Sequence, residues 1–177
     1  MTMTRDIAGI TAALQRLLEG FLPKVDLAGT PAAIGVSALP PDRIGLTPEH
    51  NGLNLYLYRI TTSSAQRNAA PPRRNRDMDG TAIDALSVDL HYMLTAYCVN
   101  DLYGQTLLGA GAMALHQTPV LASQGDPVRL TIQMMPTEEM SLLWQMFGEK
   151  YRPSIPFTAT GLVLRAADAA PVVTPSP

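Results

Sequence analysis

Apolar residues recur at helical spacing near the start of the chain. They form one stripe over about four turns, made of Ile7, Ile10, Leu14, Leu17, Leu18 and Phe21. This spacing predicts an amphipathic helix whose apolar face packs on a core. Thr4 is placed to cap this helix, and Asp6 lies in its first turn, where an acid is favourable. Gly20 and Pro23 predict the helix end.

Alternation of apolar and polar residues gives the clearest strand signal between Leu86 and Cys98. One face carries Leu86, Val88, Leu90, Tyr92, Leu94, Ala96 and Cys98, and the other carries Ser87, Asp89, His91, Met93, Thr95 and Tyr97. We therefore expect a long strand with one buried face and one mixed face that meets solvent or another subunit. Asp89 and His91 are the candidate interface residues on the mixed face.

Shorter strands are predicted at residues 32–39, 53–60, 128–134 and 155–164. In the second of these, Tyr56, Tyr58 and Ile60 alternate with Leu55, Leu57 and Arg59, so both faces are largely apolar. Two apolar faces are typical of an interior strand. The run that begins at Val128 is apolar on one side only.

Two further helices are predicted in the second half of the chain. Asn100 or Asp101 is placed to cap the first, which ends near His116. Thr137 is placed to cap the second, which ends at Gly148. Its buried stripe consists of Met140, Leu143, Trp144 and Phe147.

The predicted element order indicates an α+β fold with a mixed or mainly antiparallel sheet and three main helices. A chain of 177 residues is long enough to bury one sizeable core, and a second domain would be cramped. We expect a single domain over residues 1–165. The Pro/Ala-rich residues 166–177 are expected to form a flexible tail.

Residues 61–81 interrupt the pattern with Ser, Asn, Pro, Arg and Gly and are predicted to form a long exposed loop. Arg67, Arg73, Arg74 and Arg76 lie in this loop, with no acid before Asp77. One interpretation is a solvated linker. The other is an arm that docks on an acidic surface of a partner, and the four arginines are then candidate interface residues.

Composition and charge exclude several classes of protein. Hydrophobic residues make up 46% of the chain and the net charge is −2, which argues against a disordered chain and against a nucleic-acid binder. No apolar run approaches the roughly 20 residues that span a bilayer, and we expect no secretory signal peptide. The lone cysteine, Cys98, excludes a disulfide within one chain and is expected to be an inert core thiol.

No catalytic, cofactor-binding or metal-binding residues are expected. His50, His91 and His116 are far apart and have no zinc-ligand spacing. The run from Gly109 to Ala114 matches G-x-G-x-x-A, but it lies inside a predicted helix, where small residues allow close packing. These observations favour an assembly or binding protein over an enzyme.

Several segments together carry a family resemblance. They are NGLNLYLYRITTSSAQRN, PPRR, VDLHYMLTAY, LLGAGAMALHQTPVL and PTEEMSLLWQMFGEKYRPSIPFTATGLVL, which follow one another over nearly the whole chain. In this order they resemble the N-terminal domain of the tube-terminator, or cap, proteins of extracellular contractile injection systems. These are phage-tail-like particles of the antifeeding-prophage and Photorhabdus virulence cassette type.

The resemblance implies a tail-terminator-like fold for residues 1–165 and a structural role without catalysis. It implies a hexameric ring that closes the distal end of the inner tube and sheath, stops polymerisation and anchors the last sheath ring. Its partners would be other copies of itself, the inner tube protein and the sheath protein. Such a protein is made in the bacterial cytoplasm and assembles into a particle that lysis can release. The alternative is a small adaptor or regulatory binding module that uses the Arg-rich loop as its ligand arm.

Overall fold

The computed structural model describes residues 6–22, 34–44, 51–63, 85–121 and 127–165. The elements in chain order are α1 (Ile7–Phe21), β1 (Ile34–Ser37), the short 3-10 helix η2 (Pro41–Arg43), β2 (Asn51–Thr62), β3 (Ala85–Tyr97), α3 (Asp101–Gln117), β4 (Val120–Leu121), β5 (Val128–Ile132), α4 (Thr137–Met146) and β6 (Ser154–Arg165). Within these ranges, no helix combines the length and the apolar character that a membrane crossing requires.

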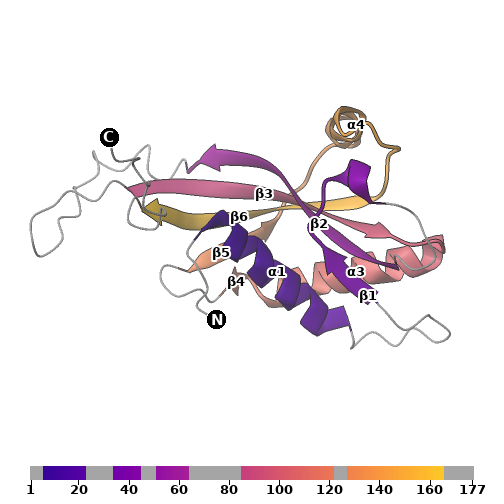
Figure 1. Ribbon diagram of the computed structural model, residues 1–177, viewed down its shortest axis with the longest axis horizontal. Coiled ribbons are helices and arrows are strands. Elements are labelled where there is room, and N and C mark those ends of the chain that lie inside the picture. The colour runs from indigo at the N-terminus through magenta and orange to yellow at the C-terminus, as the bar shows by residue number, and fades with distance from the viewer. Residues whose placement is uncertain (1–5, 23–33, 45–50, 64–84, 122–126, 166–177) are drawn as a thin grey trace, which may run out of the picture.

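The strands form one six-stranded sheet in the order β1-β2-β3-β6-β5-β4. Only the β1–β2 pair is parallel, and every other pair is antiparallel. Helices α1 and α3 lie against one face of the sheet, whereas α4 lies on the opposite side near one end (Figure 1). The prediction of an α+β fold with three main helices and a mixed, mostly antiparallel sheet is confirmed.

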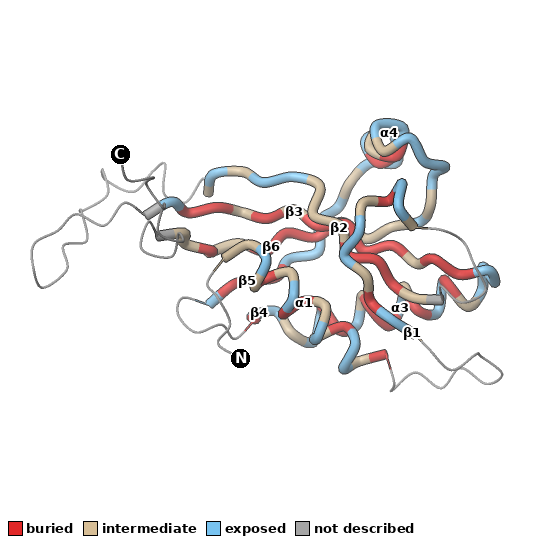
Figure 2. Tube along the Cα trace, in the orientation of Figure 1, coloured by how far each residue is buried: buried red, intermediate tan, exposed pale blue. Residues whose placement is uncertain are grey.

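The main core lies between the sheet and the helix pair α1/α3. The apolar face of β3 supplies its centre, where Leu90, Tyr92 and Leu94 are fully buried. Figure 2 shows that much of β3 is buried. The Tyr92 ring stacks on Phe157 of β6 with 5.4 Å between ring centroids. Its hydroxyl shares a 2.8 Å hydrogen bond with Thr11 of α1, and burial raises the pKa of Tyr92 to about 12. The tyrosine therefore joins three elements at the core.

Small residues let α3 approach the sheet closely. A Cβ placed on Gly111 would meet Leu94 Cδ2 at 2.7 Å and Leu53 Cδ1 at 3.0 Å, and both leucines are buried. A Cβ on Gly109 would meet nothing within 4 Å. The G-x-G-x-x-A match thus lies well inside α3, and Gly111 serves helix–sheet packing, as the sequence indicates.

A second, smaller core lies on the other side of the sheet, under α4. It contains Met93 and Tyr97 of β3 together with Met140 and Trp144 of α4. Phe147 packs edge-to-face on Trp144, with ring centroids 5.8 Å apart. The indole N–H of Trp144 has no hydrogen-bond partner among the described residues, so apolar packing holds α4 in place. The predicted stripe of the third helix is confirmed: Met140 and Trp144 are buried, and Leu143 and Phe147 are partly buried and pack against the same cluster.

Two predicted helix caps are wrong or untested. The N-cap of α1 is Asp6, whose carboxylate accepts a 2.6 Å hydrogen bond from the Gly9 N–H, while Thr4 lies outside the described residues. Thr137 is the first residue of α4 and not its cap. Pro136 precedes it and makes no side-chain cap bond. Asn100 does cap α3, as predicted, by accepting from the Tyr103 N–H at 3.1 Å.

The strand boundaries also depart from the sequence pattern. In the described chain β2 has a neighbouring strand on both sides only at residues 51–54, so it is an interior strand there and an edge strand beyond. Its second apolar face has another cause: Tyr56 packs on Phe147, and Tyr58 packs against the core under α4. β2 includes residues 61 and 62, which the pattern had placed in the loop. β5 ends at Ile132, where the side chain is 44% exposed, and the two-residue strand β4 has no signal in the sequence.

Replacing Trp144 with Ala should lower the free energy of unfolding by about 3–5 kcal/mol, because a fully buried indole leaves a cavity between α4 and β3. The matched control on the same helix is Leu142→Ala, since Leu142 is 59% exposed and surface changes cost within about 0.5 kcal/mol. Urea unfolding of both variants measures the difference. Equal stabilities of the two variants would contradict the placement of α4.

Candidate partner interface

The sheet face that carries α4 continues beyond that helix as a row of polar side chains. We call Arg59, Thr61, Asp89, His91 and Thr158 the polar strip. They come from β2, β3 and β6, where cross-strand pairing sets Arg59 and Thr158 opposite His91, and Thr61 opposite Asp89. No helix of the described chain covers this part of the sheet (Figure 1).

A β-bulge creates the strip on β2. The pairing with β3 shifts between Leu57, which faces Tyr92, and Arg59, which faces His91. The extra residue, Tyr58, breaks the simple alternation, so that Arg59 joins the α4 side and Ile60 turns to the other side opposite Leu90. Strict alternation had placed Arg59 with Leu55 and Leu57, and that placement is wrong.

Hydrogen bonds fix His91 in the middle of the strip. Its Nε2 lies 2.9 Å from the Thr61 hydroxyl, and its Nδ1 lies 3.4 Å from the Thr158 hydroxyl. The Tyr58 ring lies at an angle beside the imidazole, with ring centroids 6.2 Å apart. The two hydroxyl groups thus hold the imidazole of His91 on the mixed face of β3.

The polar strip contains a histidine with a lowered pKa and a carboxylate oxygen without a hydrogen-bond partner among the described residues. Burial lowers the pKa of His91, and the Arg59 guanidinium lowers it further, while the Asp89 carboxylate opposes both. Asp89 Oδ1 is buried and accepts no hydrogen bond from any described residue. A buried carboxylate oxygen without a hydrogen-bond donor costs free energy.

The other four candidate interface residues, Arg67, Arg73, Arg74 and Arg76, lie outside the described residues. The last described residue before them is Ser63, whose N–H donates to the Ser87 carbonyl at 3.0 Å. Ser63 therefore lies beside the polar strip. Whether the arginines form a contact arm stays a prediction.

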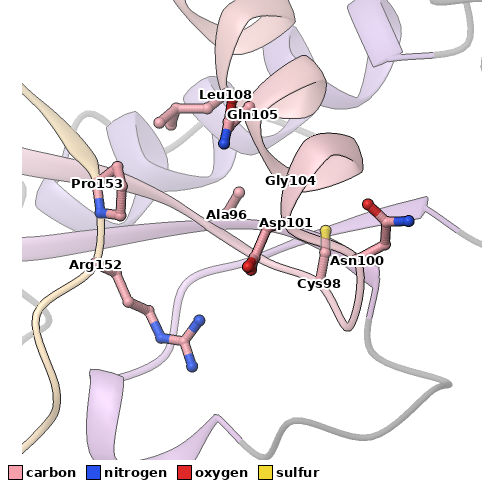
Figure 3. Close-up of a pocket in the computed structure, with 9 residues that line it drawn as sticks. All are labelled: Ala96, Cys98, Asn100, Asp101, Gly104, Gln105, Leu108, Arg152 and Pro153. Atoms are coloured by element: carbon pink, nitrogen blue, oxygen red, sulfur yellow. The ribbon is translucent and has the colours of Figure 1, made fainter.

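A pocket of about 260 Å³ lies where the end of β3 meets the start of α3 (Figure 3). Its walls are Ala96, Cys98, Asn100, Asp101, Gly104, Gln105, Leu108, Arg152 and Pro153. Burial raises the pKa of the Cys98 thiol, against the opposing effects of the Gly52 backbone hydrogen bond and the Arg152 charge. A thiol with a raised pKa is a poor nucleophile, in agreement with the inert core thiol predicted for Cys98.

The described residues offer no group of three or more His, Cys, Asp or Glu side chains that could hold a metal ion. Arg152 lies over the Tyr97 ring, 4.9 Å from its centroid, and so contributes to packing on the α4 side. What the described surface can do is donate and accept hydrogen bonds along the polar strip.

Comparison with known proteins identifies the kind of protein that shares this fold. Residues 9–175 match a family model described as the Pvc16 N-terminal domain. No curated protein matches the chain.

Two solved structures share the fold. The structure of a PVC sheath/tube terminator in the extended state superposes with a TM-score of 0.70 and 17% identity over 97% of this chain and 62% of the other. The anti-feeding prophage tube-terminating cap gives 0.65 and 19% over 97% of this chain and 61% of the other. The chain thus spans about three fifths of each of these proteins.

The environment of His91 predicts a pH dependence of stability. Because its pKa in the folded chain lies below the usual value near 6.5, the unfolded chain binds a proton first as the pH falls. Folding stability is therefore lost as the pH falls from about 7 towards about 5. Replacing His91 with Gln should reduce this loss, as urea unfolding at several pH values would show. The same pH dependence in both proteins would contradict the burial of His91.

Proposed function

The chain belongs to the Pvc16 N-terminal domain family, and from this membership we propose that it serves in the cap that terminates the tube and sheath of an extracellular contractile injection system. The observation that carries the proposal is that nearly all of this chain superposes on two proteins described as a sheath/tube terminator and a tube-terminating cap. The role is structural and needs no catalytic residue.

The cap would act by covering the last ring of a polymer. A terminator must match the rotational symmetry of the tube, and the proposed assembly is a ring of six copies. Contacts between neighbouring copies in a ring join two different surfaces of the same chain and close by rotation. Residues 1–165 would form the body of each subunit, and residues 166–177 would be a flexible extension.

The polar strip and the arginine segment are the proposed contacts with the tube and sheath proteins. His91 and Asp89 lie on a sheet face that no described helix covers. Arginine forms bidentate hydrogen bonds with carboxylates, so the segment with Arg73 and Arg74 suits an acidic neighbour. Pro71 and Pro72 come just before these arginines in the sequence, and proline restricts the backbone and so reduces the entropy that docking costs.

Deleting the gene should leave particles whose tube and sheath lengths vary widely, because nothing would stop polymerisation. Electron microscopy of particles with and without the protein measures the length distribution, and expression of the chain from a plasmid should restore a narrow one. Uniform, extended particles in the deletion strain would contradict the terminator role. That result would favour the adaptor alternative.

Reversing two charges, Arg73→Glu with Arg74→Glu, should reduce incorporation into particles, most strongly at low salt, where ion pairs are least screened. The matched control is Arg16→Glu with Arg43→Glu, which makes the same change in net charge at two exposed positions on α1 and η2. Co-purification with sheath and tube proteins is the readout. Equal incorporation of both double variants would exclude the arm.

A further inference from the structure

β2 has an open edge over more than half of its length. β1 pairs with it only from Asn51 to Asn54. At the end of this pair, the side-chain amide of Asn54 binds the backbone of Leu39. It donates to the Leu39 carbonyl at 3.0 Å and accepts from the Leu39 N–H at 3.1 Å. Pro40 and Pro41 follow, and in the described chain no strand pairs with this side of β2 beyond Asn54.

β6 has an open edge on the opposite side of the sheet. Its last partner on β5 is Arg129, which faces Thr160. Val128 comes next and pairs with Leu121 of β4, and Pro127 before it has no N–H to extend the ladder. The Pro127 carbonyl oxygen lies 3.0 Å from where a Cβ of Gly161 would be, and Gly161 takes a positive φ of 96°. Within the described ranges, no strand pairs with residues 162–165 of β6 on this side.

Both edges carry few of the features that usually prevent strand addition: β2 has the bulge at Tyr58 and the charge of Arg59, and β6 has a register shift near Gly161 and ends on Arg165. Exposed edges in natural proteins are blunted by lysine, proline or inward-pointing charges. The open part of β6 reads Leu-Val-Leu-Arg and ends on the charge of Arg165, and the open part of β2 carries Arg59 as its one charge; neither part contains a lysine or a proline. Ile60 on β2 is 49% exposed and Leu86 on β3 is 51% exposed beside these edges. An apolar strand end of this kind is expected to be covered in the assembled state.

We infer that the open edge of β2 in one copy pairs in parallel with the open edge of β6 in the next copy, and that this contact closes the ring. β2 and β6 both run antiparallel to β3, so they run parallel to each other. Rotation about an axis parallel to the strands preserves their direction. A ring with such an axis can therefore place β6 of one copy beside β2 of its neighbour with the two strands parallel.

A second copy fits these edges better than an unrelated strand. The chain itself supplies two edges on opposite sides of β3, which is the arrangement a head-to-tail contact needs. The edges are also staggered, since β2 is open opposite Leu94–Asp89 and β6 is open opposite Val88–Ala85. Stagger between neighbouring strands is what closure of a sheet into a ring requires. This inference rests on the proposed cap function.

Disulfide formation between the two edges tests the contact. Thr61→Cys and Val163→Cys are combined in a Cys98→Ser background, and Arg59→Cys with Val163→Cys tests a second register on the same face. Within one chain β3 lies between the two cysteines of either pair, so they are at least about 9 Å apart. A disulfide can bridge only roughly 7 Å. Glu138→Cys with Val163→Cys is the control, because Glu138 is exposed on α4.

The variants are produced together with the tube and sheath proteins, and purified particles are oxidised and examined on denaturing gels. The inference predicts a ladder of covalent oligomers for at least one edge pair and monomers for the control and for each single cysteine. Monomers for both edge pairs, in particles that contain the chain, would overturn the inference and leave the cap function standing. Absence of the wild-type chain from particles would overturn the cap function and this inference with it.

Discussion

Both packing layers of the chain depend on β3, which pairs with β2 along one edge and with β6 along the other. Its odd and even residues enter different environments. Leu90, Tyr92 and Leu94 pack beneath α1 and α3, whereas Met93 and Tyr97 pack beneath α4. Without this strand the two cores would lose their common wall. The same strand carries Asp89 and His91 past the end of α4, so the candidate interface has the rigidity of the core.

The sequence predicts the features that depend on local periodicity. The alternation between Leu86 and Cys98 indicates β3 and both of its faces, and helical spacing indicates α1, α3 and the stripe of α4 around Trp144. It does not predict the bulge at Tyr58, because an extra residue in a ladder is specified by the partner strand and not by the local pattern. The strip around His91 could therefore be predicted on β3 but not on β2, where Arg59 changes face.

The described surface suits assembly more than chemistry. The histidine in the strip is held by two hydroxyl groups instead of a base–nucleophile pair, and the buried Cys98 has a raised pKa. What the fold leaves unsatisfied is a carboxylate oxygen of Asp89 and the edges of β2 and β6. Open backbone edges can be satisfied by strands of other chains. The proposed ring would place such a strand beside each edge.

A cryo-electron microscopy map of the distal end of the particle is the most direct measurement. The account predicts that this fold occupies a single closed ring at that end, with β2 of each subunit beside β6 of the next and the polar strip against the tube or sheath. A map in which the fold is absent from the distal end would contradict the cap function. A ring whose subunits touch only through their helices would contradict the role of the sheet edges.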